Sequence, residues 1–388
     1  MKRLLAFLLV LILVAGLAAC DGTTPPEAPP TQTTPGTSAT GTGNILDERT
    51  VSVVILRHSW TDFLGTAIMR FVDNVITPEF NITVELMTIG SSTAEDVVAG
   101  TENAVAAGAD IILTATTAGL EASCRIAQQA GVAFGVVYAH PTVAELERLQ
   151  QFDNWIGSVG IEMDSYQSGR SAAEQLIADG HDNFAIVSWT HGLLPMADRK
   201  VEGFLSAIHD AGRNVVFELY EMPGPGMIVA ISTMLQIHGR EIEYIIAQGG
   251  GMGFVGPALT QSDMVIPTYS SSLPDDFEAF FDAGLLNFIS TFNNTLFAFS
   301  IVQGINFLNG TPLPGTPELR LFESSEVILR TVEQTREFVE KAYGPTAFTL
   351  TADELRSIIV AYNPEATFAD LVFLLERVDL RGIVERLG

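Results

Sequence analysis

The sequence predicts an α/β protein with two doubly wound, parallel-sheet lobes followed by a helical C-terminal tail. Short apolar runs rich in β-branched residues alternate with stretches of helical periodicity, and this alternation fills two consecutive halves of similar size. Once an N-terminal leader is set aside, roughly 340 residues remain, which is more than a single hydrophobic core normally serves. Two lobes are therefore expected.

The first lobe opens with residues 51–56, a continuous apolar run of the kind that forms a parallel strand covered on both faces. The helical spacing of Leu64, Ile68 and Phe71 predicts the helix that follows it. In this half we predict strands over residues 51–56, 83–89, 108–114 and 132–138, and helices over residues 63–75, 94–107 and 120–130.

Residues 155–204 carry the transition from the first lobe to the second. In order, this stretch contains a strand over residues 155–159, a helix with Gly169 and Arg170, a strand over residues 184–189, a loop, and a helix with Gly203 and Phe204. The second half then repeats the alternation, with strands over residues 215–220, 243–247, 264–269 and 287–291, and helices over residues 227–238, 275–283 and 296–308 besides a short one ending at Leu259.

From about residue 330 the pattern changes to helices alone. Thr351 and Glu354 have the spacing of a capping box, and Thr367 begins a similar start three residues before Asp370. We expect this tail to pack on one lobe through an apolar stripe. The alternative is that it docks on a membrane partner. The stripe consists of Leu371, Leu374, Leu375 and Val378.

The N-terminus has the order of a signal peptide. Lys2 and Arg3 precede an apolar run over residues 4–17, which is shorter than the roughly 20 residues of a membrane-spanning helix. The sequence Leu-Ala-Ala-Cys ending at Cys20 resembles the lipobox of bacterial lipoproteins, in which the cysteine receives lipid and becomes the first mature residue. An ordinary secretory signal that happens to end near a cysteine is the alternative.

The residues after Cys20 are mostly Thr, Pro, Gly and Ser, a composition that cannot bury enough surface to offset its ordering entropy. We interpret this segment as a tether that holds the folded part away from the membrane. The expected boundaries are 1–19 for the signal peptide, 20–47 for the tether, 48–160 with 293–328 for the first lobe, 161–292 for the second lobe and 329–388 for the helical extension.

Charge and cysteine content exclude some classes of function. Loss of Lys2 and Arg3 with the signal peptide lowers the formal net charge from −26 to −28, which argues against nucleic acid as a partner. If Cys20 carries lipid, Cys124 is the only free thiol and no intramolecular disulfide forms. Cys124 lies among apolar residues of a predicted helix, so we expect a buried structural cysteine.

Several segments between residues 50 and 328 resemble the type I periplasmic binding proteins, in particular the ribose-type sugar-binding branch. Each is weak alone, and their order and spacing carry the resemblance. The matching segments are residues 106–113, 127–132, 156–158, 168–170 and 199–204.

The resemblance implies two α/β lobes joined by a hinge of three crossing strands, near residues 157–161, 291–293 and 322–326, with the ligand held between the lobes by hinge closure. Proteins of this family deliver small solutes, mostly sugars, to an ABC permease. We accordingly expect a monomeric, lipid-anchored, extracytoplasmic solute-binding protein of an importer, with no cofactor, no metal and no catalytic residues.

Candidate ligand contacts follow the predicted strands, because ligands of such sheets bind at the carboxyl ends of strands. In the first lobe the resemblance implies aromatic stacking and polar contacts from the loop after the first strand. The candidates there are His58, Trp60, Asp62 and Phe63, followed by Ser91, Thr116, Tyr138 and His140 after the later strands. Core packing is the alternative for Phe63, and helix capping is the alternative for the hydroxyl residues.

In the second lobe the sequence departs from the sugar-binding pattern. Gly249 and Gly250 stand where Asn and Asp usually bind hydroxyls, and Tyr269 stands where the strand usually ends in Asp. Arg199 is the candidate for a sugar-clamping arginine, with Asp198 competing for the position. The full set of second-lobe candidates is Arg199, Gln248, Gly249, Tyr269 and Asn293.

These departures replace carboxylates, which accept two hydroxyl hydrogen bonds, by aromatic rings with one polar tip each. Tyr138 and Tyr269 are examples. Such a site suits a nucleoside better than a simple hexose, so a nucleoside-binding lipoprotein is the alternative within this fold.

Two other classes remain open from the sequence. A receptor subunit that reports ligand occupancy to a membrane kinase or chemoreceptor uses the same closure. An enzyme finds little support, since the chain has no GxSxG, HExxH, P-loop or metal-ligand spacing. His58, His140 and His191 follow predicted strands, and we expect them to be loop or surface histidines.

Overall fold

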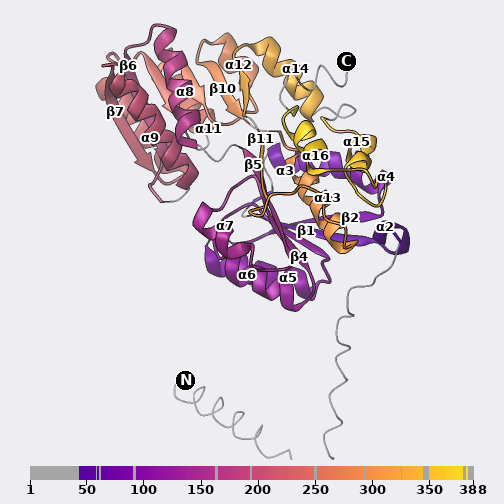
Figure 1. Cartoon of the computed structure of the whole chain (residues 1–388). Helices are drawn as coiled ribbons and strands as arrows, with labels where there is room; N and C mark the ends of the chain where they lie inside the picture. Colours follow the sequence, from indigo (N-terminus) through magenta and orange to yellow (C-terminus); the bar gives the residue numbers. More distant parts are fainter. Residues whose placement is uncertain are drawn as a thin grey trace, which may run out of the picture. The chain divides into compact units, whose positions relative to one another are not determined.

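The protein is described by a computed structural model. The structure describes residues 43–57, 59–60, 63–90, 93–161, 165–192, 195–248, 251–291, 293–324, 326–343 and 349–378, together with residue 382. Two six-stranded sheets with alternating helices and a helical tail make up this part of the chain, which confirms the predicted fold class. Figure 1 shows the arrangement of these elements.

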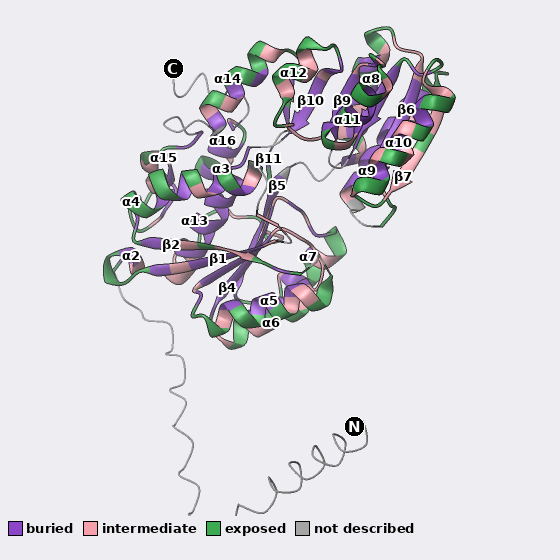
Figure 2. Ribbon diagram, turned by 180° about the vertical axis from the view of Figure 1, so that it is seen from behind, coloured by how far each residue is buried: buried purple, intermediate pink, exposed green. Residues whose placement is uncertain are grey.

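The first sheet has the strand order β11-β5-β4-β3-β1-β2, and all of its neighbouring strands are parallel. Its strands are β1 (Val51–Arg57), β2 (Ile82–Thr88), β3 (Ile111–Thr114), β4 (Ala133–Val137), β5 (Trp155–Ile161) and β11 (Leu321–Ser324). The inner strands β1, β3 and β4 are largely buried while the helices expose their outer faces (Figure 2), as expected of a parallel sheet covered on both sides.

Two hydrophobic clusters cover the two faces of this sheet. One face packs on α5 (Ala94–Ala106), α6 (Leu120–Gln129) and α7 (Val143–Leu149). The other packs on α3 (Phe63–Phe71) and on α13 (Leu296–Leu308), whose residues 296–306 are all buried. The predicted first helix continues past α3 as a π-helical segment, η1 (Val72–Ile76), and a short α4 (Thr77–Glu79).

The second sheet has the strand order β12-β10-β9-β8-β6-β7, and only the β10–β12 pair is antiparallel. Its strands are β6 (Asn183–Trp189), β7 (Asn214–Glu221), β8 (Tyr244–Ala247), β9 (Thr268–Ser270), β10 (Leu286–Thr291) and β12 (Val327–Leu329). Because β12 pairs with β10, residues 327 and 328 belong to the second sheet and not to the first lobe, where the sequence boundaries placed them.

One face of the second sheet carries α8 (Ser165–Ala178) and α9 (Pro195–Asp210), which run side by side (Figure 1). The opposite face carries α10 (Pro225–His238), α11 (Met252–Ser262) and α14 (Val332–Tyr343), with α12 (Phe277–Asp282) beside α14. Glycines allow α8 and α9 to meet closely, since a Cβ on Gly169 would lie 2.0 Å from the Lys200 carbonyl oxygen.

The chain passes between the two sheets four times. Three passages fall where the sequence predicts them, after β5, after β10 and between β11 and β12. The fourth follows α14, since residues 349–378 return to the first sheet with α15 (Ala352–Ser357) and α16 (Phe368–Leu375) packed near α13 and β11 (Figure 1). From the sequence we expected the tail to pack on one lobe. Instead, α14 packs on the second lobe and residues 349–378 pack on the first.

The tether ends earlier than its predicted boundary at residue 47. A short helix, α2 (Ile45–Glu48), begins after Asn44, whose side chain accepts a hydrogen bond from the Leu46 amide. Leu46 is buried in the core, and the Ile45 amide donates to Asn309 Oδ1 at 2.7 Å. The apolar pair Ile45 and Leu46 supplies the buried surface that the preceding Thr- and Pro-rich residues lack.

Candidate functional site

A row of polar side chains crosses the second sheet at the carboxyl ends of its strands. Ile186 pairs with Ile246 in the register of β6 and β8, and both pack toward α8 and α9. Side chains two residues further along a strand point to the same face, so Ser188 and Gln248 lie next to each other there. Ser290 occupies the corresponding place on β10, two residues after the buried Phe288.

Two members of this row lack a hydrogen-bond partner. Ser188 Oγ and Gln248 Oε1 are buried without one, and these residues are 0% and 8% exposed. Nearby, the Trp189 indole N–H at the end of β6 is also buried and unpaired. Buried polar atoms are nearly always hydrogen-bonded, so such atoms mark a place where water or a ligand supplies the bond.

Tyr269 lies beside this row but inside the core. It is 0% exposed, and its ring contacts Phe204 and Phe288 at centroid distances of 5.1 Å each. Its hydroxyl is buried without a hydrogen-bond partner. Burial raises the pKa of this phenol above its ordinary value and outweighs the positive charge of Lys200, which acts to lower it, so the group is neutral. From the sequence we expected the Tyr269 ring to contact a ligand. In the structure the ring is buried beneath the polar row.

A buried ion pair closes the row on the side of β10. Lys200 Nζ lies 2.5 Å from Glu326 Oε1 and 3.2 Å from Ser290 Oγ, and the Ser290 hydroxyl also bonds to the Glu326 carboxylate. Burial alone would lower the pKa of Lys200, but the neighbouring Tyr269 and Glu326 outweigh it and the pKa is raised. This cluster could not be predicted from a local sequence pattern, because Lys200 and Glu326 are 126 residues apart.

On the first sheet, Tyr138 follows β4 in a left-handed backbone conformation, with φ at +64°. A bulky residue rarely adopts this region, and such strain is often found at functional sites. The Tyr138 hydroxyl donates to the Asn294 carbonyl oxygen at 2.5 Å, and the Tyr138 amide donates to Val159 O at 2.8 Å. Tyr138 therefore ties the carboxyl end of β4 to the crossing that follows β10.

His140 is fixed by a local hydrogen-bond chain. The Ser158 hydroxyl donates to the Ala139 carbonyl oxygen at 2.8 Å, and His140 Nδ1 lies 2.6 Å from Ser158 Oγ. Since the single hydroxyl proton is used on Ala139, Nδ1 carries the proton and donates to Ser158. His140 is thereby oriented at the carboxyl ends of β4 and β5.

The candidate Asn293 and its neighbour Asn294 differ in their hydrogen bonding. Asn293 is 0% exposed, and its Oδ1 accepts from Thr295 and Thr349 while its Nδ2 donates to Val378 O at 2.9 Å. These bonds occupy both ends of the amide, so Asn293 serves the packing of the crossing. Asn294 Oδ1, by contrast, is buried and has no partner.

Three further candidates lie away from the polar row. The Trp60 indole N–H donates to the Met87 carbonyl oxygen at 3.1 Å, so the ring lies against edge strand β2. Thr116 Oγ1 accepts from the Ala118 amide, which is the capping role left open above. Arg199 is 61% exposed, forms an ion pair with Glu202 and lies over the Tyr166 ring, so the structure does not bring it to the row.

Several sequence candidates lie outside the described residues. These are His58, Asp62, Ser91, Gly249 and Cys20, and the described part of Phe63 is its backbone at the start of α3.

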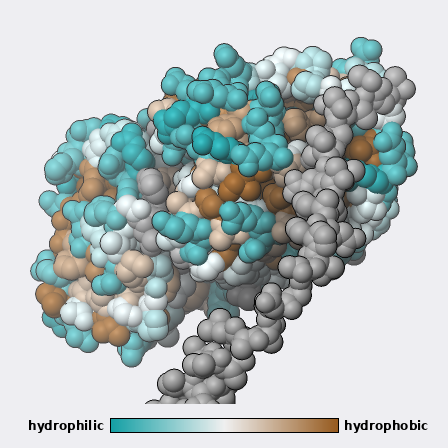
Figure 3. Space-filling view, turned by 90° about the horizontal axis from the view of Figure 1, so that it is seen from below, coloured by the Kyte–Doolittle hydropathy of each residue, from teal (hydrophilic) through white to brown (hydrophobic). Residues whose placement is uncertain are grey.

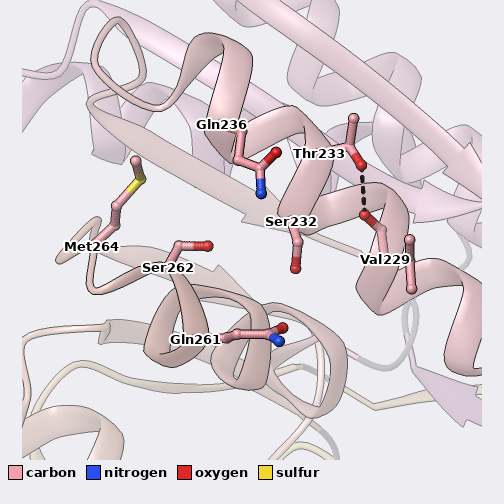
Figure 4. Close-up of a pocket in the computed structure, with 7 residues that line it drawn as sticks. All are labelled: Val229, Ser232, Thr233, Gln236, Gln261, Ser262 and Met264. Atoms are coloured by element: carbon pink, nitrogen blue, oxygen red, sulfur yellow. Dashed lines mark hydrogen bonds between the residues drawn. The ribbon is translucent and has the colours of Figure 1, made fainter.

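Two hollows of the described surface lie away from the row. A groove of about 430 Å³ lies between α10 and the end of α11 (Figure 4). Since α11 ends at the amino side of β9, this groove is at the opposite edge from the polar row. Its lining residues are uncharged, and the Thr233 hydroxyl donates a hydrogen bond to the Val229 carbonyl oxygen at 2.9 Å. The lining residues are Val229, Ser232, Thr233, Gln236, Gln261, Ser262 and Met264.

A second hollow of about 690 Å³ lies between α3 and edge strand β2 and includes Trp60 and Arg70. The surface in Figure 3 mixes hydrophilic residues with small hydrophobic patches. Within the described ranges no cluster of three or more metal-ligating side chains occurs. No helix among these residues combines the length and hydrophobicity needed to cross a bilayer.

No protein-family model matches the chain, and no curated protein sequence does either. Solved structures do match. A periplasmic sugar-binding protein from Pseudomonas fluorescens has a TM-score of 0.65 at 13% identity, over 86% of this chain and 99% of the other. A galactofuranose-binding protein has a TM-score of 0.61 at 17% identity, over 76% of this chain and 99% of the other.

A third match is a periplasmic solute-binding protein of an ABC transporter from Actinobacillus succinogenes, solved with bound D-allose. Its TM-score is 0.60 at 14% identity, over 74% of this chain and 99% of the other. The chain therefore has the type I periplasmic binding protein fold, as its sequence motifs predict.

Proposed function

We propose that the chain is an extracytoplasmic solute-binding protein that captures a neutral, hydroxyl-bearing solute at the carboxyl ends of its two sheets. The observation that carries the proposal is the polar row, in which Ser188 Oγ and Gln248 Oε1 are buried and unpaired. A buried polar atom without a partner costs free energy, so a solute that supplies the missing bonds binds favourably. Asn294 Oδ1, at the crossing after β10, is a third such atom.

The location supports this proposal. Strands β5, β10 and β11 each end where the chain leaves for the other sheet, so the carboxyl edges of both sheets adjoin the crossings. Ligands of open α/β sheets bind at carboxyl ends. Tyr138 and His140 on the first sheet then face the same region as Gln248 on the second, and closure about the crossings would enclose the solute.

The charge of the region favours a neutral solute. The charged groups in the row, Lys200 and Glu326, neutralise each other at 2.5 Å, and no other charged side chain belongs to the row. The unpaired atoms of Ser188, Gln248 and Asn294 are a hydroxyl and two amide oxygens, which match the hydroxyl groups of a sugar. Two structures of the same fold agree with this chemistry, since one is a galactofuranose-binding protein and the other was solved with bound D-allose.

Within this function, we infer that the protein serves an importer and is anchored to the membrane through lipid on Cys20, with an ABC permease as its partner. The signal peptide and the Leu-Ala-Ala-Cys sequence support the anchor. A nucleoside is the second candidate solute, because Tyr138, a partly buried aromatic residue, lies at the carboxyl end of β4.

The test is calorimetric titration of the mature chain with a panel of neutral sugars and nucleosides, guided by mass spectrometry of any co-purified solute. For the solute that binds, Gln248→Leu is expected to weaken affinity about tenfold or more, since one buried hydrogen bond is lost. Gln236→Leu, the same change at an exposed position on α10, serves as the matched control and should leave affinity unchanged. Binding that is equal in both variants would contradict the assignment of the row.

A further inference from the structure

The fourth passage between the sheets begins with α14, which is fastened to the second lobe. Phe338 and Ala342 are buried with Val327 and Leu329 of β12 in one hydrophobic cluster. Arg336 Nε donates to Glu278 Oε1 of α12 at 2.7 Å. Helix α14 therefore moves with the second sheet.

The same helix also touches the first lobe. Ala67 of α3 is 3% exposed and belongs to the cluster of Phe338 and Ala342, although every other buried member of that cluster comes from elements around the second sheet. Helices α14 and α3 are in direct contact. This contact has to shift whenever the two sheets rotate relative to each other.

After α14 the chain is built into the first lobe. Asn306 of α13 donates to Ile358 O at 3.0 Å and accepts from the Val360 amide at 2.9 Å. Leu355 and Leu371 are buried in the cluster that covers the first sheet. Residues 349–378 are therefore a layer of the first lobe and move with it.

At the end of this layer, backbone carbonyl oxygens accept hydrogen bonds from residues beside two of the three hinge crossings. Val378 O accepts from Asn293 Nδ2 at 2.9 Å, next to the crossing after β10. Leu375 O accepts from Ser324 Oγ at 3.4 Å, next to the crossing between β11 and β12. On the far side of that last crossing, Glu326 is held by Lys200 of α9. The crossing between β11 and β12 is thus held on both sides, at Ser324 and Glu326, and the crossing after β10 is held at Asn293.

We propose that α14 and residues 349–378 form a strap that limits how far the two lobes move relative to each other. Hinge motion is normally absorbed by a few residues in the crossing segments. Here the strap adds a fourth covalent connection, a helix contact through Ala67, and bonds that hold the crossings. The range of closure is therefore set by this strap as well as by the solute. Only the link to solute capture rests on the proposed function.

The strap is tested without any solute, by measuring the distance distribution between spin labels on the two lobes. Glu147→Cys on α7 and Glu241→Cys after α10 are exposed label sites in a Cys20→Ser background, where Cys124 is buried. Ala67→Glu places a charge in the α3–α14 contact, and Thr66→Glu places the same charge at the exposed neighbouring position. We expect Ala67→Glu to widen the distribution about twofold and Thr66→Glu to leave it unchanged.

A second form of the spin-label experiment leaves the core residues unchanged. A protease site inserted between residues 343 and 349 allows the strap to be cut after folding, while residues 349–378 stay bound through their buried surface. A site inserted at Gly310, in the turn between α13 and β11, is the control cut. Widening after the first cut alone supports the strap. The proposal would be overturned if the two substituted proteins and the two cleaved proteins all gave the distance distribution of the labelled parent protein, with unchanged thermal unfolding. Because no solute is present, failure of solute binding does not affect this result.

Discussion

Lys200 of α9 holds Glu326, the residue just before β12, with 2.5 Å between Nζ and Oε1. The two side chains are 7% and 14% exposed. This pair joins a helix of the second lobe to the last crossing between the sheets. A charge buried without its partner is costly, so both residues depend on each other.

Breaking the pair on one side should destabilise the protein strongly. Lys200→Met leaves the Glu326 carboxylate buried and unpaired, and we expect a loss of about 3–5 kcal/mol in the free energy of unfolding. The double variant Lys200→Met, Glu326→Leu removes both charges and should recover most of this loss. Urea unfolding of the three proteins gives the comparison. A double variant as unstable as the single one would show that the pair itself contributes the stability.

The pair also predicts a pH dependence. Burial opposes ionisation of Glu326, but the charge and hydrogen bond of Lys200 outweigh it and lower the pKa below the ordinary 4.5. The folded state therefore binds this proton less readily than the unfolded state. The resulting stabilisation is fully present above pH 4.5 and is lost as the pH falls through the lowered pKa. The stability difference between wild type and Glu326→Gln, followed by urea unfolding from pH 7 to pH 3, should be constant above pH 5 and shrink below 4.5.

Two glycine substitutions should have opposite effects. A Cβ on Gly203 of α9 would lie 1.9 Å from the Tyr166 carbonyl oxygen of α8, and this backbone atom cannot move without separating the helices. We expect Gly203→Ala to cost about 1–3 kcal/mol. Gly253 of α11 has nothing within 4 Å of its Cβ position, so Gly253→Ala should stabilise by about 0.5 kcal/mol. Thermal unfolding measures both, and equal effects would contradict this account of α8–α9 packing.

Cys124 should be unreactive in the folded protein. It is 0% exposed, its thiol lies 3.4 Å from Asn154 Oδ1, and burial raises its pKa to about 12. The thiolate is the reactive form and is scarce at neutral pH for such a group. In a Cys20→Ser background, a thiol reagent at pH 8 should modify the native protein at the rate of unfolding and the urea-unfolded protein at once. Rapid modification of the native protein would show that the site opens.

The fold could be predicted because its signals are local. Apolar β-branched runs such as residues 51–56 and helices such as Ala94–Ala106 appear in the structure within a few residues of their predicted bounds. The predicted strand over residues 264–269 is the exception, since only Thr268–Ser270 pairs in the sheet. Hydrophobicity alone does not separate a short strand from the extended chain that leads into it.

The site was less predictable, because its key relationships join residues far apart in sequence. No local pattern separates Asn293, whose amide is fully bonded, from Asn294, whose side-chain oxygen is unpaired. The position of Ser188 beside Gln248 depends on strand register, which a single sequence does not give. Arg199 and Lys200 differ by one residue, yet one is on the surface and the other is buried.

The burial of α13 on all sides has a consequence for biogenesis. Its partners are β4 and β5, which precede it in the chain, and residues 349–378, which follow it. The first lobe therefore cannot complete its core until residue 378 has been synthesised, whereas the second lobe has nearly all of its strands by residue 291. A chain that emerges vectorially across a membrane would fold its middle before its beginning, and a stop codon shortly before residue 349 would leave the N-terminal lobe, not the C-terminal one, incomplete.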